Sequence, residues 1–131
     1  IFLDETSTAE TASNRAYLTR VRETTPGTLA LNPGTTCPEW FMEVCDIVMI
    51  AETTAAKYMA RTMPAWVRKY ETRRFYHCVH DCPVAEMPAV LKRMRENGAG
   101  YVYVTDQLHP GCYGAIPTNY DAFVQAARSM P

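Results

Sequence analysis

Five short apolar runs divide the chain, and each is followed by polar residues or by glycine and proline. The runs are rich in β-branched and aromatic residues and lack strict alternation, which is typical of strands buried on both faces of a parallel sheet. They cover residues 1–3, 28–31, 46–51, 75–79 and 101–104. We therefore expect five buried strands.

Between these strands, apolar residues recur at helical spacing. The expected helices cover residues 14–24, 38–44, 83–97 and 118–128. The third is the clearest, because Met87 and Leu91 share one face and Gly98 supplies a stop signal. Residues 52–74 are the least regular stretch, and we interpret the basic run at 68–74 as a solvated helix face rather than an anion site.

The alternation of strands and helices predicts right-handed βα crossovers and a parallel α/β sheet. The strands start about 25 residues apart, so eight such units would fill about 200 residues, near the lower size of a (β/α)8 barrel. The sequence therefore predicts a partial TIM barrel of about five βα units. A doubly wound sheet is the rival architecture, but no G-x-G-x-x-G turn follows any strand, so nucleotide binding lacks support.

The first residue bears on the extent of the domain. The chain opens at Ile1, inside an expected strand and without Met or a leader. We expect residues 1–131 to be a single domain that forms the C-terminal part of a barrel, strands 4 to 8, with the N-terminal strands missing. Such an open sheet would expose an apolar edge and face, so we expect this piece alone to be inactive or poorly folded.

Composition and charge exclude several classes of protein. The chain has 131 residues, 47% of them hydrophobic, and its 13 Lys and Arg against 14 Asp and Glu give a net charge of −1. The apolar content argues against disorder, and no apolar run is long enough to cross a bilayer. Basic residues are scattered rather than gathered in a stripe, so we expect no nucleic-acid partner.

Five cysteines are many for a cytosolic domain of this size and favour an oxidising compartment. The odd number would leave one thiol unpaired unless its partner lay in a missing part, and five buried free thiols are the alternative. The cluster of His77, Cys78, His80 and Cys82 contains zinc-ligand residue types. Strand alternation sends neighbours to opposite faces, so we expect no metal and favour a disulfide through Cys78 or Cys82.

Polar side chains follow each expected strand, at the edge where function gathers in parallel α/β folds. Acidic groups at such positions are costly unless they are paired, solvated in a cleft or used. The residues at these strand ends are Asp4, Glu5, Asn32, Glu52, His80, Asp81 and Asp106. We expect several of them to converge on one rim.

Two of these acids are placed for cleavage of a glycosidic bond. Asp4 and Glu52 follow different strands, so the sheet can hold them on opposite sides of a sugar, one protonating the leaving oxygen and the other acting as nucleophile or base. Trp40, Tyr103 and Tyr113 are expected near the same rim, where their rings can stack on sugar faces. The alternative is that the acids only cap the following helices.

The chain resembles the spherulation-specific family 4, or spherulin-4-like, cell-surface proteins. The matching blocks span nearly the whole chain in the family's order: residues 1–5 (IFLDE), 31–35 (LNPGT), 46–52 (DIVMIAE), 79–80 (VH) and 100–106 (GYVYVTD). The match is fairly specific because it includes a turn of asparagine, proline and glycine and an acid that closes the next strand. Each block alone would be weak.

This resemblance implies a (β/α)8 barrel and, as in fungal members, endo-α-1,4-galactosaminidase activity on galactosaminogalactan, a partly deacetylated polysaccharide. Asp4 and Glu5 match the family's adjacent acids, and Glu52 matches its distant Glu. By similarity, Asp4 is the expected nucleophile, Glu52 the general acid/base and Glu5 a helper that positions or tunes them. Further substrate contacts are expected from Asn32, His80, Tyr103, Asp106 and Tyr113.

The resemblance also sets the expected context of the protein. The partner is a polysaccharide substrate, no cofactor is expected, and the location is secreted or at the cell surface. A membrane or wall anchor would have to come from missing N-terminal sequence. The alternative function is a non-catalytic wall or spore-coat protein that keeps the barrel and binds glycan without cutting it.

Overall fold

The computed structural model describes residues 1–118 and 120–129. Its strands form one five-stranded sheet in the order β1-β2-β3-β4-β5, and each neighbouring pair is parallel. The strands are β1 (Phe2–Leu3), β2 (Ala30–Leu31), β3 (Ile47–Thr54), β4 (Phe75–His80) and β5 (Tyr101–Val104). Parallel neighbours in sequence order require a crossover after every strand, so the predicted α/β class is confirmed.

Helices and short 3-10 turns provide these crossovers. The α-helices are α1 (Ala12–Thr24), α2 (Ala55–Met59), α3 (Met87–Glu96) and α4 (Tyr120–Arg128), and the 3-10 helices are η1 (Glu39–Glu43), η2 (Ala65–Lys69), η3 (Thr72–Arg74) and η4 (Val84–Glu86). The helix expected at 118–128 includes Asn119, which lies outside the described residues. No helix in the described part of the chain is long and apolar enough to span a membrane.

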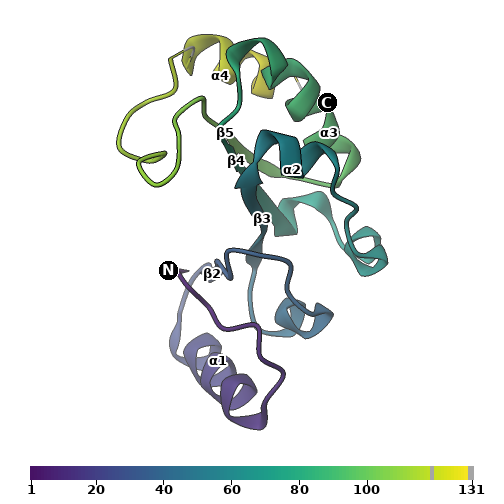
Figure 1. Ribbon diagram of the computed structural model, residues 1–131. Coiled ribbons are helices and arrows are strands. Elements are labelled where there is room, and N and C mark those ends of the chain that lie inside the picture. The colour runs from purple at the N-terminus through teal and green to yellow at the C-terminus, as the bar shows by residue number, and fades with distance from the viewer. Residues whose placement is uncertain (119, 130–131) are drawn as a thin grey trace.

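The core is divided between two hydrophobic clusters. The first core cluster lies between α1, η1 and β2 to β4 and includes Leu18, Leu29, Leu31, Phe41, Val48, Ile50 and Phe75. The second core cluster joins β3 to β5 with α2, α3 and α4 and includes Tyr58, Val79, Val90, Leu91, Met94, Val104 and Phe123. Figure 1 shows α1 and α4 at opposite ends of the molecule, each beside one cluster.

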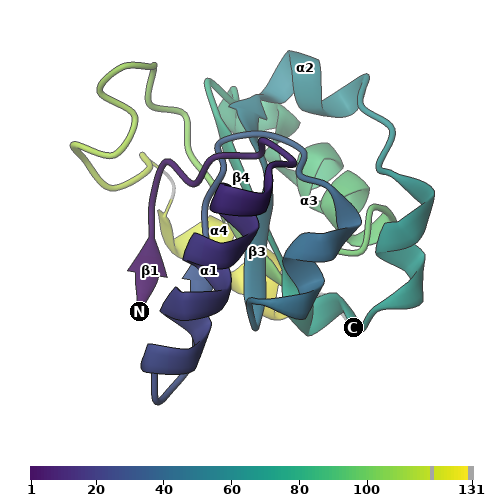
Figure 2. The same cartoon turned by 90° about the horizontal axis from the view of Figure 1, so that it is seen from below.

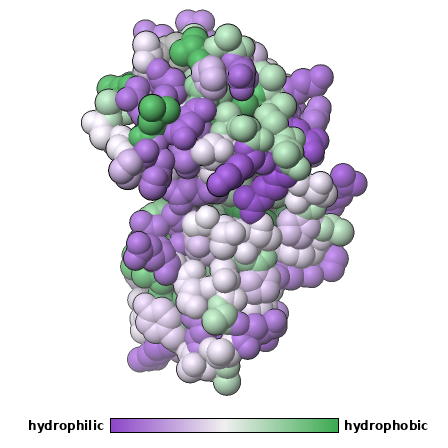
Figure 3. All heavy atoms as spheres, in the orientation of Figure 1, coloured by the Kyte–Doolittle hydropathy of each residue, from purple (hydrophilic) through white to green (hydrophobic). Residues whose placement is uncertain are grey.

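The helices and the long loop before α4 lie on different sides of the sheet. In Figures 1 and 2, α2 and α3 are on one side of β3 and β4, and the loop between β5 and α4 projects on the other. This second side also carries an apolar hollow of about 320 Å³, lined by Phe2, Ala30, Leu31, Ile47, Met49, Tyr76, Tyr101 and Val102. On the face drawn in Figure 3, hydrophobic residues are more frequent over the upper part, where α2 to α4 lie.

Two predicted segments differ from the structure. β3 extends three residues beyond the expected end at Ala51, so Glu52 lies inside the strand, beside Cys78 of β4, instead of following it. The basic run at 68–74 is mostly exposed to solvent, as expected, but it is divided between the two short 3-10 helices η2 and η3. Its last member, Arg74, donates hydrogen bonds to the carbonyl oxygens of Met42, Cys45 and Asp46.

The expected disulfide is wrong, because all five cysteines are buried free thiols. Cys78 contacts the Tyr113 hydroxyl, with 3.3 Å between sulfur and oxygen, on the side of the sheet that carries the long loop. Cys82 instead packs in the second core cluster beneath α3. The two thiols have different surroundings because Cys82 lies beyond the end of β4, in the turn that leads to α3.

Candidate active site

The predicted strand-end residues of β1 to β4 meet in one open depression. It has a volume of about 520 Å³ and is lined by Asp4, Glu5, Thr6, Asn32, Pro33, Gly34, Glu52, His80 and His109. Each of the first four strands contributes at least one polar side chain, because the carboxyl ends of parallel strands share an edge. The structure thus brings five predicted site residues together: Asp4, Glu5, Asn32, Glu52 and His80.

Asn32 joins the two acids predicted to carry catalysis. Its amide nitrogen donates to Asp4 Oδ1 at 2.7 Å and to Glu52 Oε2 at 2.9 Å. Since both oxygens bind one nitrogen, the distance between them cannot exceed about 5.6 Å. The two carboxylates therefore face one another across a single amide group.

The turn after β2 fixes the orientation of the Asn32 amide. Asn32 Oδ1 accepts a hydrogen bond from the backbone N–H of Gly34 at 2.8 Å, which leaves the nitrogen facing the acids. Gly34 has a φ of +66°, a left-handed conformation that glycine adopts without a steric penalty. The backbone of Asn32 is also paired, with Leu3 at its N–H and with Thr6 at its carbonyl.

The other oxygen of Glu52 is held from the opposite side. The hydroxyl of Tyr113, in the loop between β5 and α4, donates a hydrogen bond to Glu52 Oε1. The same hydroxyl lies 3.3 Å from the Cys78 sulfur. Both carboxylate oxygens of Glu52 are therefore occupied, one by an amide and one by a phenol, which restricts the rotation of its side chain.

Glu5 enters the depression from a strained backbone. Its φ is +50°, and Asp81, directly after β4, has a φ of +52°. Side chains other than glycine are uncommon in this region, and such residues collect at functional sites. The Glu5 carboxylate makes no hydrogen bond or ion pair within the described residues, so its oxygens are free for a ligand.

Two histidines, His80 and His109, also line the depression, and Asp81 lies beside them. The rings of His80 and His109 have centroids 5.6 Å apart. Asp81 Oδ1 accepts from the backbone N–H of His109 at 2.9 Å and lies 3.2 Å from His80 Nδ1. The first of these bonds is the main cause that lowers the pKa of Asp81. His109 was not predicted, because it does not directly follow a strand but lies inside the long loop between β5 and α4.

Three predicted site residues lie outside this depression. Asp106 accepts hydrogen bonds from the backbone N–H and the hydroxyl of Thr118, and these lower its pKa. It therefore fastens the base of the loop before α4. Tyr103 is half-buried beside Tyr113 and Phe123, with ring centroids 6.3 and 6.2 Å apart.

Trp40 is not at the rim, and its predicted role in sugar stacking is wrong. It is 5% exposed, packs 4.7 Å from the ring of Phe41, and has the Arg15 guanidinium 5.0 Å from its ring centroid. An apolar residue in a short helical turn can face either the solvent or the core. Here three consecutive residues of η1, Trp40, Phe41 and Met42, all pack in the first core cluster.

The residues of the His/Cys cluster do not converge. His77 lies under α2, where its Nδ1 is 2.6 Å from the Tyr58 hydroxyl, whereas His80 faces the depression on the other side. Within the described residues, no group of three His, Cys, Asp or Glu side chains is placed to hold a metal ion.

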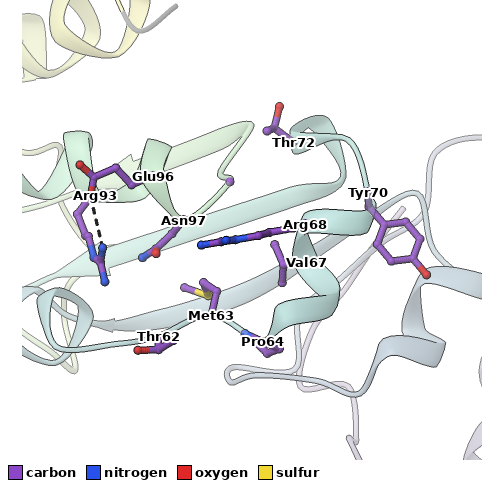
Figure 4. A pocket seen from close by; sticks show the side chains of 11 residues that line it. Thr62, Met63, Pro64, Val67, Arg68, Tyr70, Thr72, Arg93, Glu96 and Asn97 are labelled. Atoms are coloured by element: carbon purple, nitrogen blue, oxygen red, sulfur yellow. Dashed lines mark hydrogen bonds and ion pairs between the residues drawn. The ribbon is translucent and has the colours of Figure 1, made fainter.

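A second hollow, of about 420 Å³, lies between η2 and the end of α3. Figure 4 shows the Arg68 side chain extended across it towards Asn97. The acidic residue in its lining is Glu96, which pairs with Arg93 at 3.3 Å. This hollow lacks the two facing carboxylates of the depression at the strand ends, so we place the candidate active site at the latter.

A parallel βα sheet that gathers polar side chains at its carboxyl edge has the architecture of part of a (β/α)8 barrel. The chain belongs to spherulation-specific family 4, whose sequence model matches residues 1–127. Its fold is similar to that of Aspergillus clavatus Sph3, which has been crystallised in complex with GalNAc, with a TM-score of 0.84 and 20% sequence identity.

This similarity covers 98% of the chain and 56% of the Sph3 chain, so the protein described here spans about half the length of that relative. The predicted partial TIM barrel is confirmed by the likeness and by the five parallel strands. No curated protein matches the chain.

Proposed function

We propose that the protein is a glycoside hydrolase that cleaves an amino-sugar polysaccharide of the galactosaminogalactan type with retention of configuration. The observation that carries the proposal is the pair of hydrogen bonds from Asn32 to Asp4 and Glu52. Retaining glycosidases place their two carboxyl groups about 5 to 5.5 Å apart, whereas inverting enzymes need about 6.5 to 9.5 Å to admit a water. The limit of about 5.6 Å between Asp4 Oδ1 and Glu52 Oε2 supports the first geometry.

The proposed reaction has two steps. Asp4 attacks the anomeric carbon while protonated Glu52 gives its proton to the leaving oxygen, so that the glycosidic bond breaks and an ester to Asp4 forms. Glu52 then removes a proton from water, which attacks the anomeric carbon and releases Asp4. Glu5, unpaired in the same depression, is proposed to position or tune this pair.

The charge of the depression supports an amino-sugar substrate. Three carboxylates line it, those of Asp4, Glu5 and Glu52, and no Lys or Arg is among the described residues of the lining. A cleft of one charge sign raises the local concentration of the opposite sign, which favours a polysaccharide with free amines. Sph3 has been crystallised with GalNAc, an amino sugar, which also supports this substrate class. A secreted or cell-surface location is proposed on the basis of such a substrate.

The first test is hydrolysis of partly deacetylated galactosaminogalactan by the full-length protein, measured as the release of reducing ends. We expect Asp4→Asn and Glu52→Gln each to lower kcat by at least about 10²-fold, because each removes a group that takes part in bond cleavage. Glu96→Gln is the matched control, since Glu96 lies in the other hollow, and it should retain activity. The anomeric configuration of the first product, read by proton NMR, should match that of the substrate.

Two results would reject parts of this proposal. Unchanged product release by both variants would remove Asp4 and Glu52 from the reaction. Glycan binding without any release of reducing ends, by the wild type as well as the variants, would identify a non-catalytic glycan-binding protein instead.

A further inference from the structure

Glu52 lies at the end of a hydrogen-bond chain that begins inside the protein. The Cys78 sulfur is 3.3 Å from the Tyr113 oxygen, and that hydroxyl contacts Glu52 Oε1. Cys78 is completely buried on β4, next to Glu52 in the register of the sheet. Hydrogen bonds thus connect three side chains, from two strands and one loop, one after the other.

The direction of this chain follows from the protonation of its members. Burial raises the pKa of the Cys78 thiol to about 12, so the thiol keeps its proton. Burial, the Cys78 contact and the Glu52 contact raise the pKa of Tyr113, so the phenol keeps its proton as well. The Tyr113 hydroxyl donates to Glu52 Oε1, as it does whenever Glu52 is an ionised carboxylate, and the thiol is left to donate to the phenol oxygen.

The loop that carries Tyr113 is fastened at three places. At its base, Asp106 binds the backbone N–H and the hydroxyl of Thr118. Further along, the backbone N–H of His109 donates to Asp81 at 2.9 Å. Tyr113 itself is the third attachment, so its hydroxyl is held in place although 56% of the residue is exposed.

We propose that Tyr113 and Cys78 are positioning residues that hold the Glu52 carboxylate in its reactive orientation. Tyr113 fixes Oε1, Asn32 fixes Oε2, and the Cys78 thiol orients the phenol by donating to its oxygen. This inference gives Tyr113 a role through its hydroxyl, beyond the ring stacking expected from the sequence. Its catalytic consequence rests on the proposed function.

Other titratable groups also face Glu52 and are common to every variant compared below. They come from the residues after β1, from β4 and from the loop before α4, and comprise Asp4, Glu5, Tyr76, His80 and His109. Because these groups surround Glu52 in wild type and variants alike, differences between variants report the altered hydrogen bond.

The kinetic test compares variants that differ by one hydrogen-bonding group. Tyr113→Phe keeps the aromatic ring and removes the hydroxyl, and we expect kcat to fall about tenfold with KM unchanged, as for the loss of one hydrogen bond to a charged group. Cys78→Ala should lower kcat by a smaller factor, while Cys78→Ser, which restores a donor in a side chain of similar size, should recover it. Wild-type kcat in Tyr113→Phe, or equal kcat in the Ala and Ser variants, would overturn the proposal.

A second measurement does not depend on hydrolysis. In protein labelled with ¹³C at the tyrosine ζ position, the Tyr113 signal, assigned by its loss in Tyr113→Phe, reports ionisation of the phenol. Because Cys78 and Glu52 raise the pKa of Tyr113, we expect the phenol to ionise at lower pH in Glu52→Gln than in the wild type. An unchanged titration of Tyr113 in Glu52→Gln would contradict the proposed hydrogen-bond chain. If the wild type releases no product but the titration shifts as expected, the proposed function is rejected and the hydrogen-bond chain from Cys78 to Glu52 is supported.

Discussion

Asn32 is the residue on which the geometry of the candidate site depends. It is 5% exposed, and all the hydrogen-bonding groups of its side chain are used, the nitrogen by two acids and the oxygen by Gly34. Two carboxylates this close repel one another unless a donor or a proton lies between them. The amide provides that donor without a charge of its own.

An isosteric change isolates this donor. Asn32→Asp keeps an acceptor for the Gly34 N–H but replaces the shared amide with a third carboxylate. We expect the free energy of unfolding at pH 7 to fall by about 2–3 kcal/mol. The loss should shrink as the pH is lowered towards about 4, because protonation of one carboxylate restores a donor between the others.

Urea unfolding of wild type, Asn32→Asp and Asn32→Ala at several pH values checks this expectation. Asn32→Ala lacks both the donor and the added charge, so it should show a smaller loss at pH 7. An Asn32→Asp protein as stable as the wild type at pH 7 would contradict the bridging role.

At the residue scale, the sequence identified site residues that follow from strand direction alone. Asp4, Glu5, Asn32 and Glu52 could be predicted because parallel strands end at one edge. His109 could not, because its position depends on the path of a loop held by Asp81. The hydrogen-bond partners of the acids could not be predicted either. No residue pattern distinguishes an acid that faces a cleft from one that binds the next loop, as Asp106 does.

At the scale of elements, the approach of β5 to η3 sets a strict packing requirement. Gly100 directly precedes β5, and its N–H donates to the Phe75 carbonyl at 3.1 Å. A Cβ at this position would lie 2.4 Å from the carbonyl oxygen of Thr72 and 2.7 Å from Arg73 Cα. Both neighbours are backbone atoms, so a side chain would force β5 and η3 apart.

We expect Gly100→Ala to lower the free energy of unfolding by about 2–3 kcal/mol, as other overpacked positions do. Gly27→Ala is the matched control, because no heavy atom lies within 4 Å of a Cβ at that position, and it should change stability by less than about 0.5 kcal/mol. Thermal or urea unfolding of both variants measures the difference. Equal stability of the two variants would show that the backbone of η3 can move away from β5 at little cost.

The elements themselves were largely predictable, and their lengths were not. All five strands lie within or beside the predicted apolar runs, since buried parallel strands need apolar side chains on both faces. The extension of β3 to Thr54 could not be foreseen, because its last three residues are polar and gain their place through pairing with β4. The helix expected at 38–44 is the 3-10 helix η1, where the first core cluster takes Trp40, Phe41 and Met42 together.

At the scale of the whole molecule, His77 joins three elements on the side of the sheet that α2 and α3 cover. It belongs to β4 and is fully buried, and the Tyr58 hydroxyl of α2 lies 2.6 Å from its Nδ1. Asn97, at the end of α3, donates to the same hydroxyl at 3.3 Å. Burial, with a smaller contribution from Arg61, lowers the pKa of His77 to about 3.

This buried histidine makes stability depend on pH. In the unfolded chain His77 binds a proton below about pH 6.5, whereas in the fold it stays neutral until about pH 3. The unfolded state therefore gains more protons as the pH falls, and the folded state loses about 2–3 kcal/mol between pH 6.5 and about pH 4.5. His77→Asn keeps a polar group near Nδ1 and cannot titrate there, so this part of the loss should disappear.

Urea unfolding across this pH range provides the measurement, with His109→Asn as the control, because His109 is exposed. A slope in His77→Asn equal to that of the wild type would assign the acid sensitivity to other groups.

The architecture was the most predictable property of the molecule, because it depends on the order and spacing of elements. The apolar side opposite α2 and α3, with Phe2 and Tyr101 about half exposed, agrees with the open sheet expected from five βα units. The disulfide was not predictable, since pairing depends on which side of the sheet each sulfur faces.

The five buried thiols can be used to follow local unfolding of the protein. Burial raises the pKa of Cys37, Cys45 and Cys78 to about 12, and a thiol that keeps its proton reacts slowly with alkylating reagents. Cys37 and Cys45 belong to the first core cluster and Cys82 to the second. The order in which mass spectrometry finds these sulfurs modified therefore reports which half of the core exchanges with solvent first, without any introduced label.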